Sequence, residues 1–334
     1  MSYIKDQSHG NYRHYYARRR VNDEYPLPLD QDERLSLLDP SLFKGKVVLD
    51  VGCNSGEVAV ELAQRYQASS VIGVDIDSAL IDQCQHTVEH AFSLQKPATS
   101  DDSSASSPIT PNVDSREPTR KKRKTKNGSV QDGSSKCSTR LVDRQYFPAF
   151  FPEIYGPIDI RGVSLWKSAP DEANSGNKRT QRAEEPSDAP ASQTAFPRNL
   201  VFYSADWTNT SIETDQSGYD VILGFSLTKW IHLHNLDEGL VKFFRKCYNS
   251  LNQGGVLILE KQSWKGYKQA KRSSQKLKQN YQVLKLRPET DFDRVLLEDI
   301  GFSKKETVKE TETEKGFDRD IEMYWKLSTR LHPA

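Results

Sequence analysis

Residues 46–64 of the chain read KVVLDVGCNSGEVAVELAQ, and this stretch decides the fold class. Residues 47–51 are a short apolar run followed by a glycine, which is typical of a buried strand. Residues 57–66 place Val58, Leu62 and Ala63 on one side of a predicted helix. The glycines between the two elements allow a tight turn that brings backbone close to a ligand. The free N–H groups at the start of the helix suit an anionic group, so the stretch predicts a ligand-binding strand–turn–helix unit.

The rest of the chain continues this alternation of strands and helices. Helices are predicted over residues 78–94, capped by Asp77 or Ser78, over residues 237–251, closed by Gly254 and Gly255, and over residues 291–300. Strands are predicted over residues 70–76, 200–206, 219–226, 256–260, 305–311 and 321–327. The pattern predicts a Rossmann-like α/β fold, with a seven-stranded, mostly parallel sheet and helices on both faces.

One long interruption separates the two halves of this pattern. Residues 96–140 and 168–197 are polar, rich in Ser, Thr, Pro and Asp, and lack apolar periodicity. An apolar and aromatic island, residues 146–166, lies between them and is expected to add a strand or a helix of unassigned position. We therefore predict an N-terminal segment over residues 1–45 that covers the cofactor and substrate. A domain over residues 46–334 follows, interrupted by a largely disordered insertion over residues 96–198.

The composition narrows the class of protein. The chain has 334 residues, a net charge of +1 and a hydrophobic fraction of 35%, so part of its length is expected to stay unpacked. No apolar run approaches the roughly 20 residues that span a bilayer, and no membrane association is expected. Four scattered cysteines form neither a zinc-type pair nor a disulfide framework. The near-neutral total hides basic clusters, so it does not exclude a nucleic-acid partner.

Acidic residues follow the predicted strands where a nucleoside would bind. Asp75 ends the second strand about 20 residues after the glycine turn, where a carboxylate can bind ribose hydroxyls. Asp206 and Trp207 end the third, where they can contact an adenine amine and ring. The alternative roles are a helix cap for Asp75 and a core aromatic for Trp207. Because Asn54 stands where a dinucleotide-binding turn has glycine, S-adenosylmethionine is the predicted cofactor and NAD the alternative.

Several motifs resemble one methyltransferase family, the bicoid-interacting, methylphosphate capping enzymes of small RNAs. The shared motifs cover the chain outside the insertion: GNYRHYY (10–16), DVGCNSG (50–56), GVDID (73–77), GFSLTKWIHLH (224–234), DEGL (237–240), GGVLILEKQSW (254–264) and KGFDR (315–319). The resemblance implies a class I S-adenosylmethionine-dependent methyltransferase acting on a 5′-phosphate oxygen of small non-coding RNA. The better-known branch methylates the γ-phosphate of 7SK or U6 small nuclear RNA, and a sister branch methylates 5′-monophosphates. Asp206-Trp207 and the size of the insertion depart from the family pattern.

The resemblance also implies roles for individual residues. The residues expected at the RNA end and the reaction are Tyr15, Lys229, Trp230 and Phe317. The residues expected at the cofactor are Tyr16, Arg34, Gly52, Cys53, Asn54, Gly56, Asp75, Ile76, Asp206, Trp207 and Phe225. No metal is expected: His232 and His234 could suggest a pair of ligands, but no third ligand converges on them, and structural roles are expected for both.

The chemistry of a phosphate acceptor agrees with these residue types. A phosphate oxygen is already anionic at neutral pH, so no strong general base is required. Catalysis then depends on alignment and on holding charge, which Lys229 and nearby arginines can do while Tyr15 hydrogen-bonds an oxygen. Trp230 or Phe317 can stack on the first base. Outside its motif, Lys229 would be read as an ordinary surface lysine.

The resemblance and the basic segments also predict partners and a cellular location. The resemblance implies a ribonucleoprotein with La-related proteins as partners and a monomeric catalytic subunit. Residues 121–124 (KKRK) resemble a nuclear import signal, so a nuclear location is expected, with a cytoplasmic pool as the alternative. The basic segments 18–20 and 265–278 could hold RNA, although a solvated helix face explains the second equally well. An RNA-binding scaffold with weak catalysis is the main alternative, and a protein or metabolite methyltransferase is disfavoured because an NPPY-type loop is lacking.

Overall fold

The computed structural model describes residues 15–16, 32–95, 150–160, 163, 165–168, 195–309 and 319–327. These ranges contain the predicted glycine turn, all the predicted strands and part of the insertion. They also contain two residues of the N-terminal motif, Tyr15 and Tyr16, which lie against the domain. Among the helices in these ranges, none combines the length and apolar character needed to cross a membrane.

A single eight-stranded sheet organises the domain, in the order β3-β4-β2-β1-β5-β6-β8-β7. Strands β1 to β6 run parallel, and β8 pairs antiparallel with both β6 and β7. The strands are β1 (Val47–Val51), β2 (Ser70–Asp75), β3 (Trp166–Ser168), β4 (Leu200–Ser204), β5 (Tyr219–Phe225), β6 (Leu251–Glu260), β7 (Lys304–Val308) and β8 (Ile321–Trp325). From β1 the chain first adds β2 on one side of the sheet and later adds β5 on the other side of β1. The carboxyl ends of β1 and β5 therefore mark the switch point at which such sheets bind ligands.

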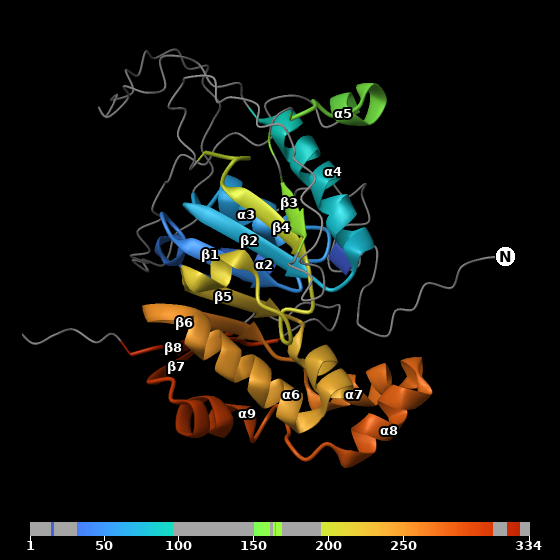
Figure 1. Cartoon of the computed structure of the whole chain (residues 1–334), viewed down its shortest axis with the longest axis vertical. Coiled ribbons are helices and arrows are strands. Elements are labelled where there is room, and N and C mark those ends of the chain that lie inside the picture. The colour runs from blue at the N-terminus through green and yellow to red at the C-terminus, as the bar shows by residue number, and fades with distance from the viewer. Residues whose placement is uncertain are drawn as a thin grey trace, which may run out of the picture.

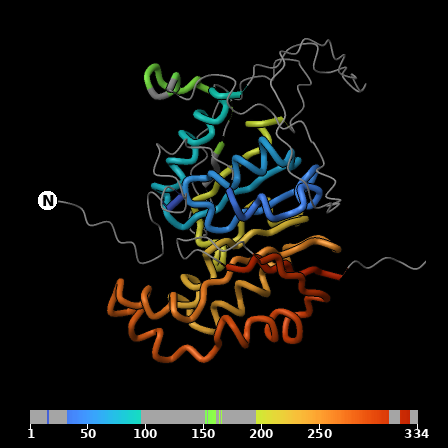
Figure 2. The backbone as a smooth tube through the Cα atoms, turned by 180° about the vertical axis from the view of Figure 1, so that it is seen from behind, coloured from blue at the N-terminus to red at the C-terminus, as the bar shows by residue number. Residues whose placement is uncertain are grey.

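Helices cover both faces of the sheet, and Figures 1 and 2 show α4 with α5 towards the β3–β4 end and α6 to α9 towards the β6–β7 end. The α-helices are α2 (Glu33–Ser36), α3 (Glu57–Gln64), α4 (Ser78–Leu94), α5 (Phe150–Tyr155), α6 (Thr228–Ser250), α7 (Trp264–Ala270), α8 (Gln275–Val283) and α9 (Phe292–Arg294). Short 3₁₀ turns are η1 (Pro40–Leu42), η3 (Glu213–Gln216) and η4 (Lys271–Ser273), and η5 (Val295–Ile300) is a π-helical turn that continues α9.

The core is divided by the sheet because neighbouring strand residues point to opposite faces. Val48 packs with Val58 and Leu62 of α3 and with residues of α4. The next residue, Leu49, packs on the other face with Phe243 and Phe244 of α6. Strands buried on both faces read as continuous apolar runs, which is why residues 47–51 could be recognised from sequence.

The predicted fold class is confirmed, and a strand or helix is found at each predicted place, with bounds that differ by a few residues except at the start of the helix predicted over residues 237–251. Asp77 is the residue that caps α4, since its carboxylate accepts a hydrogen bond from the N–H of Ala79 at 3.0 Å. The eighth strand is an addition: β3 comes from the apolar island in the insertion and pairs with β4, Trp166 facing Phe202 in register. The island thus supplies both a helix, α5, and an edge strand.

The start of the helix predicted over residues 237–251 is wrong, and so is its closure by glycines, although its end is correct to within one residue. Helix α6 begins at Thr228 and is interrupted by a non-helical Leu236 (φ 61°, ψ −170°), so only its second half was recognised. The first half forms because Trp230, Ile231 and Leu233 are buried. Gly254 and Gly255 do not close the helix, since the chain enters β6 at Leu251. Leu251 and Val256 pair with Tyr219 and Val221, so the glycines lie in a bulge between these pairs.

The basic stretch after β6 is helical, as one of its two interpretations expected. Residues 264–283 form α7, η4 and α8. Trp264 stacks on Tyr267 and Tyr281 with ring centroids 4.9 and 4.7 Å apart. These rings pack on a small core of their own with Leu233 and Leu277. Aromatic contacts between residues 17 positions apart are not visible as a periodic sequence pattern, which explains why the bounds and the packing of these helices were not predicted.

The glycine that ends the cofactor turn gives a stability prediction. Gly56 has φ +81°, and a Cβ there would lie 3.0 Å from the Phe202 ring and 3.1 Å from the Cys84 sulfur. Gly45 has a similar φ, +70°, with nothing within 4 Å of its Cβ position. We expect Gly56→Ala to lower the free energy of unfolding by about 2–4 kcal/mol, the sum of left-handed strain and overpacking. Gly45→Ala should lower it by only about 1–2 kcal/mol, from strain alone. Equal losses in chemical denaturation would contradict the packing argument.

Candidate active site

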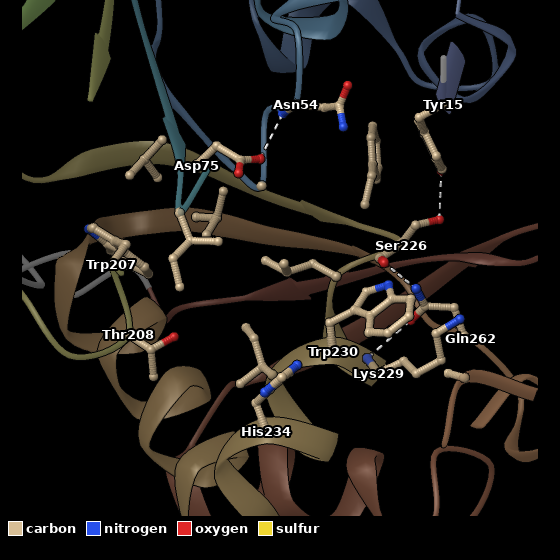
Figure 3. Close-up of a pocket in the computed structure, with 18 of the residues that line it drawn as sticks. Tyr15, Asn54, Asp75, Trp207, Thr208, Ser226, Lys229, Trp230, His234 and Gln262 are labelled. Carbon is tan, nitrogen blue, oxygen red and sulfur yellow. Dashed lines mark hydrogen bonds between the residues drawn. The ribbon is translucent and has the colours of Figure 1, made fainter. Parts of the chain in front are cut away.

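A cavity of about 660 Å³ opens at the switch point, between the carboxyl ends of β1, β2 and β5 and the start of α6. Figure 3 shows Asn54 and Asp75 on one side of it and Ser226, Lys229 and Trp230 on another. The first group lies in the turn after β1 and at the end of β2, and the second follows β5. Residues that are more than 150 positions apart in sequence therefore share one site.

The glycine turn lines the cavity and is fixed by contacts with β2 and Leu227. Gly52 has φ +78°, and its N–H donates to the Val74 carbonyl at 2.8 Å. A Cβ on Gly52 would lie 3.0 Å from the side chain of Leu227. Asn54 also has a positive φ, 53°, which asparagine tolerates better than most residues. The turn thus presents backbone to the cavity without a bulky side chain.

Asp75 is both a structural and a ligand-facing carboxylate. One oxygen accepts from the N–H of Asn54 at 3.0 Å and the other from the N–H of Asp77 at 2.9 Å. Burial raises the pKa of this carboxyl above its usual range. The Ile76 N–H also donates to this carboxylate. Since a carboxylate has about four acceptor positions, at least one remains for a hydroxyl group of a ligand. The suggested cap role of Asp75 belongs to Asp77 instead.

Asp50 is a second buried carboxylate in the cavity wall, and it was not predicted as a site residue. Its side chain is 3% exposed, and its Oδ2 accepts no hydrogen bond among the described residues. Burial, with Arg34 acting against it, raises the pKa of Asp50 to about 7. A cationic group beside Asp50 would stabilise the ionised form. The wall therefore offers an acceptor for the ammonium group of an amino-acid-bearing nucleoside.

Ile76 and Trp207 supply the apolar part of the cofactor side. Ile76 is 48% exposed although it is a large aliphatic residue, and it lines the cavity. Trp207 also lines it but is only 2% exposed, and its Nε1 donates to Asp215 at 2.9 Å. The Lys246 ammonium lies 4.3 Å from the Trp207 ring centroid. Trp207 is thus fixed mainly as a core aromatic, and Ile76 is the exposed apolar surface that suits a nucleobase.

Lys229 and Trp230 lie in the first turn of α6. The N–H of Lys229 and the hydroxyl of Thr228 both donate to the Gln262 amide oxygen, at 3.2 Å each. The Lys229 ammonium lies 4.7 Å from the Trp230 ring centroid. Burial and then the positive charge of Arg319 lower the pKa of Lys229 to about 8. A partly dehydrated ammonium group at a cavity wall is suited to bind an anion.

Tyr15 and Tyr16 of the N-terminal motif line the same cavity. The Tyr15 hydroxyl donates to Ser226 Oγ at 2.9 Å, across 211 positions in sequence. Ser226 itself has a left-handed backbone conformation (φ 55°), a strained state that is common at functional sites. Tyr16 is buried beside Tyr15, with the rings edge to face at 5.2 Å. The tyrosines therefore occupy the predicted position at the cavity.

Most of the predicted site residues line the cavity: Tyr15, Tyr16, Arg34, Gly52, Asn54, Asp75, Ile76, Asp206, Trp207, Phe225, Lys229 and Trp230. Cys53 and Gly56 do not, and this is a correction: Cys53 is fully buried in the core, and Gly56 packs on Phe202 and Cys84 behind the turn. Phe317 lies outside the described residues. Four further residues line the cavity and were not predicted as site residues, although each lies within one of the motifs: Asp50, Ser226, Gln262 and Arg319.

The two histidines differ. His232 is fully buried, and its Nε2 and Nδ1 lie 2.7 Å from Asp237 and 3.2 Å from the Tyr267 hydroxyl, so it has the structural role expected. His234 lines the cavity instead. Among the described residues, no cluster of three potential metal ligands is found.

Two families match the chain over the segments that build this cavity. Residues 48–102 match a methyltransferase domain, and residues 219–326 match the family described as Bicoid-interacting protein 3 (Bin3). The resemblance drawn from the motifs is thereby confirmed over residues 219–326, the segment that contains Lys229, Trp230 and Gln262. The turn lies in the segment that matches a methyltransferase domain, which supports the predicted cofactor, S-adenosylmethionine, over NAD.

The alignments with three relatives cover nearly the whole chain. The 7SK snRNA methylphosphate capping enzyme of Homo sapiens is 31% identical over 97% of this chain and 40% of its own length. A protein of Arabidopsis thaliana named as a probable RNA methyltransferase is 29% identical over 95% of this chain and 80% of its own. The U6 snRNA methylphosphate capping enzyme of Drosophila melanogaster is 28% identical over 95% and 74%. This chain therefore spans well under half of the human relative.

Proposed function

We propose that this protein is an S-adenosylmethionine-dependent methyltransferase that methylates the γ-phosphate at the 5′ end of a small non-coding RNA. The observation that carries the proposal is the division of charge in one cavity. The carboxylates of Asp50 and Asp75 line its cofactor side, and the cations Lys229 and Arg319 line its acceptor side. A cationic acceptor side fits a polyanion such as a phosphate end.

The residues of the cofactor side fit S-adenosylmethionine by chemistry. Asp75 has an acceptor position for a hydroxyl group, Asp50 has an unpartnered oxygen among the described residues for an ammonium group, and Ile76 offers an exposed apolar surface. Arg34 lines the same side and can hold a carboxylate. When bound, this cofactor supplies an electrophilic methyl group on a sulfonium.

On the acceptor side, the protein would bind the phosphate group and fix its orientation. An anionic phosphate oxygen forms the new O–CH₃ bond while the C–S bond breaks and its electron pair stays on sulfur, so no proton has to be removed. Lys229 and Arg319 can reduce repulsion between phosphate oxygens and fix the attacking one. Tyr15 can donate a hydrogen bond to another oxygen after releasing Ser226. The indole of Trp230 is placed for contact with the first nucleotide.

The names of the relatives favour a phosphate acceptor on RNA over other methyl acceptors. Two of them are capping enzymes of small nuclear RNAs, and a third is named as an RNA methyltransferase. The residues that line the acceptor side agree with this class, since they provide cations and aromatic rings, as phosphate and base contacts require. The 5′-monophosphate end is the second acceptor to be tested.

Methyl transfer from labelled cofactor to RNA tests the proposal. Three RNAs of one sequence, with 5′-triphosphate, 5′-monophosphate and 5′-hydroxyl ends, should be compared. We expect label on the triphosphate end, removable by a pyrophosphohydrolase together with the γ-phosphate. Transfer only to the monophosphate end would assign the sister reaction. Tight RNA binding without transfer to any end would support the scaffold alternative.

The low pKa of Lys229 gives a pH prediction. With its pKa at about 8, the side chain loses its proton as the pH rises through that value. Because the ammonium form binds phosphate, kcat/KM should fall about tenfold for each pH unit above the pKa. Lys229→Arg, which stays protonated, should keep its residual activity constant to at least pH 10. A wild-type profile that stays flat to pH 10 would contradict a role for the charge.

We also propose that the protein stays with its RNA in the nucleus, as a monomeric catalytic subunit with La-related partners. The support is the basic run at residues 121–124 and the names of the small nuclear RNA relatives. Replacing all four residues of this run by alanine should move a fluorescent fusion to the cytoplasm. An unchanged nuclear signal would contradict the assignment of the run.

A further inference from the structure

A carboxylate at the end of β6 connects the two sides of the cavity. Glu260 is 0% exposed and is the last residue of β6. Its Oε2 accepts from Arg34 Nη1 at 2.9 Å and from Ser226 Oγ at 2.8 Å, and its Oε1 accepts from Arg319 Nη1 at 3.2 Å. A buried carboxylate is stable only when donors of this kind surround it.

One of these partners belongs to the cofactor side. Arg34 is 1% exposed, and its other guanidinium nitrogens donate to both oxygens of Asp32, at 2.9 and 2.7 Å. Its guanidinium carbon lies 4.4 Å from the ring centroid of Phe225. Glu260 and Asp32 thus fix the guanidinium from two directions, and its rotamer cannot change without breaking buried ionic hydrogen bonds.

The other partners belong to the acceptor side. Ser226 Oγ donates to Glu260 and accepts from Tyr15 and from Arg319 Nη1, the latter at 2.8 Å. Arg319 is 23% exposed at its side chain and lines the cavity beside Lys229. Glu260 therefore reaches the N-terminal tyrosine through a single hydroxyl group.

Taking the proposed methyl transfer as given, we propose that Glu260 is a positioning residue for this reaction. It holds Arg34 on the cofactor side and Ser226 with Arg319 on the acceptor side in one arrangement, so that binding on one side depends on order on the other. Glu260 itself does not line the cavity. It acts through the residues that it holds.

The network also places a negative charge where it favours the protonated form of Lys229. Arg319 lowers the pKa of Lys229 and Glu260 raises it. Arg34, beyond Glu260, and the Tyr15 hydroxyl are the other groups of the network. Removing the Glu260 charge while leaving both arginines should therefore lower the pKa of Lys229 and move the alkaline fall of kcat/KM to lower pH.

The test compares Glu260→Gln and Glu260→Asp with Glu322→Gln in the full chain. Glu322 is a matched control on the neighbouring strand β8: it is 8% exposed and accepts from Lys261 at 2.6 Å and Lys305 at 2.8 Å, but it does not line the cavity or touch these arginines. Calorimetry with S-adenosylhomocysteine, KM for triphosphate-ended RNA, the pH profile and thermal stability are measured for each.

We expect Glu260→Gln to weaken S-adenosylhomocysteine binding and to raise KM for RNA, each by about tenfold, as for the loss of one charge-assisted hydrogen bond. The kcat/KM of this variant should begin to fall at a lower pH than that of the wild type. Glu260→Asp keeps the charge but shortens the reach, so it should restore the pH profile and not the affinities. Glu322→Gln should alter stability alone.

Each outcome decides between a positioning and a structural role. If Glu260→Gln loses stability as Glu322→Gln does but keeps both affinities and the pH profile, the proposal is wrong. A variant too unstable to measure is replaced by Ser226→Ala, which cuts only the acceptor branch and should raise KM for RNA at least fivefold with cofactor affinity unchanged. No KM change would overturn the proposal. If wild type methylates no RNA end, the proposed function fails, while the calorimetry still tests the cofactor branch.

Discussion

Lys229→Ala should lower kcat/KM for triphosphate-ended RNA by about 10²–10³-fold, the range seen when one preorganised charge-stabilising donor is removed. The side chain is partly dehydrated at the first turn of α6, where it faces the acceptor side with Arg319. Because neither Asp50 nor Asp75 is among the charges that shift the pKa of Lys229, the affinity for S-adenosylhomocysteine should stay within about twofold. RNA binding outside the 5′ end should also persist.

The matched control is Lys242→Ala on the same helix. Lys242 is exposed beyond the interruption at Leu236, and its ammonium donates to Asn209. Wild-type rates are expected for this variant, because an exposed lysine contributes little away from a site. If both lysine variants lose activity equally, the loss would follow from general charge and not from the cavity. A Lys229→Ala variant with more than a third of wild-type activity would contradict the assignment.

Arg34→Met should cause the largest loss of stability. It leaves the carboxylates of Asp32 and Glu260 without the guanidinium that they share, at ion-pair distances of 2.7 and 2.9 Å. Removing one partner of a buried ion pair costs about 3–5 kcal/mol, which corresponds to a fall in Tm of roughly 6–20 °C for a chain of this size. Thermal unfolding without cofactor measures the effect.

An exposed ion pair supplies the comparison. Arg294 and Asp299 lie 2.9 Å apart with side chains 48% and 46% exposed, so Arg294→Met should cost no more than about 1 kcal/mol. The double variant Arg34→Met with Glu260→Gln should regain part of the lost stability, because one uncompensated charge is removed as well. If Arg34→Met is as mild as Arg294→Met, the buried network does not stabilise the domain.

The site shows what a local pattern can and cannot predict. Residues 47–64 determined a strand, a tight turn and a helix, because apolar periodicity and glycine act over a few neighbouring positions. The end of β2 at Asp75 followed from the same rule. Cys53 and Gly56, which were predicted at the cofactor, do not line the cavity, because within a turn the side that faces the ligand depends on what packs behind it. Here Phe202 and Cys84 fill that position.

The acceptor side depended on the resemblance and then on the tertiary structure. Lys229, taken alone, is an ordinary lysine in a segment whose helix was not predicted. Its burial, its lowered pKa and its neighbour Arg319 come from a helix start, a strand end and a distant C-terminal segment that meet only in the folded chain. The same holds for Glu260, whose partners lie 34 to 226 positions away.

The sequence by itself thus determined the alternating fold, the glycine turn and, through its motifs, the family. Tertiary structure alone decided which carboxylates and cations share one cavity and which aromatic residues belong to the core. The physical reason is that backbone propensity and apolar periodicity are local, whereas burial, ion pairing and pKa depend on groups brought together across the sheet.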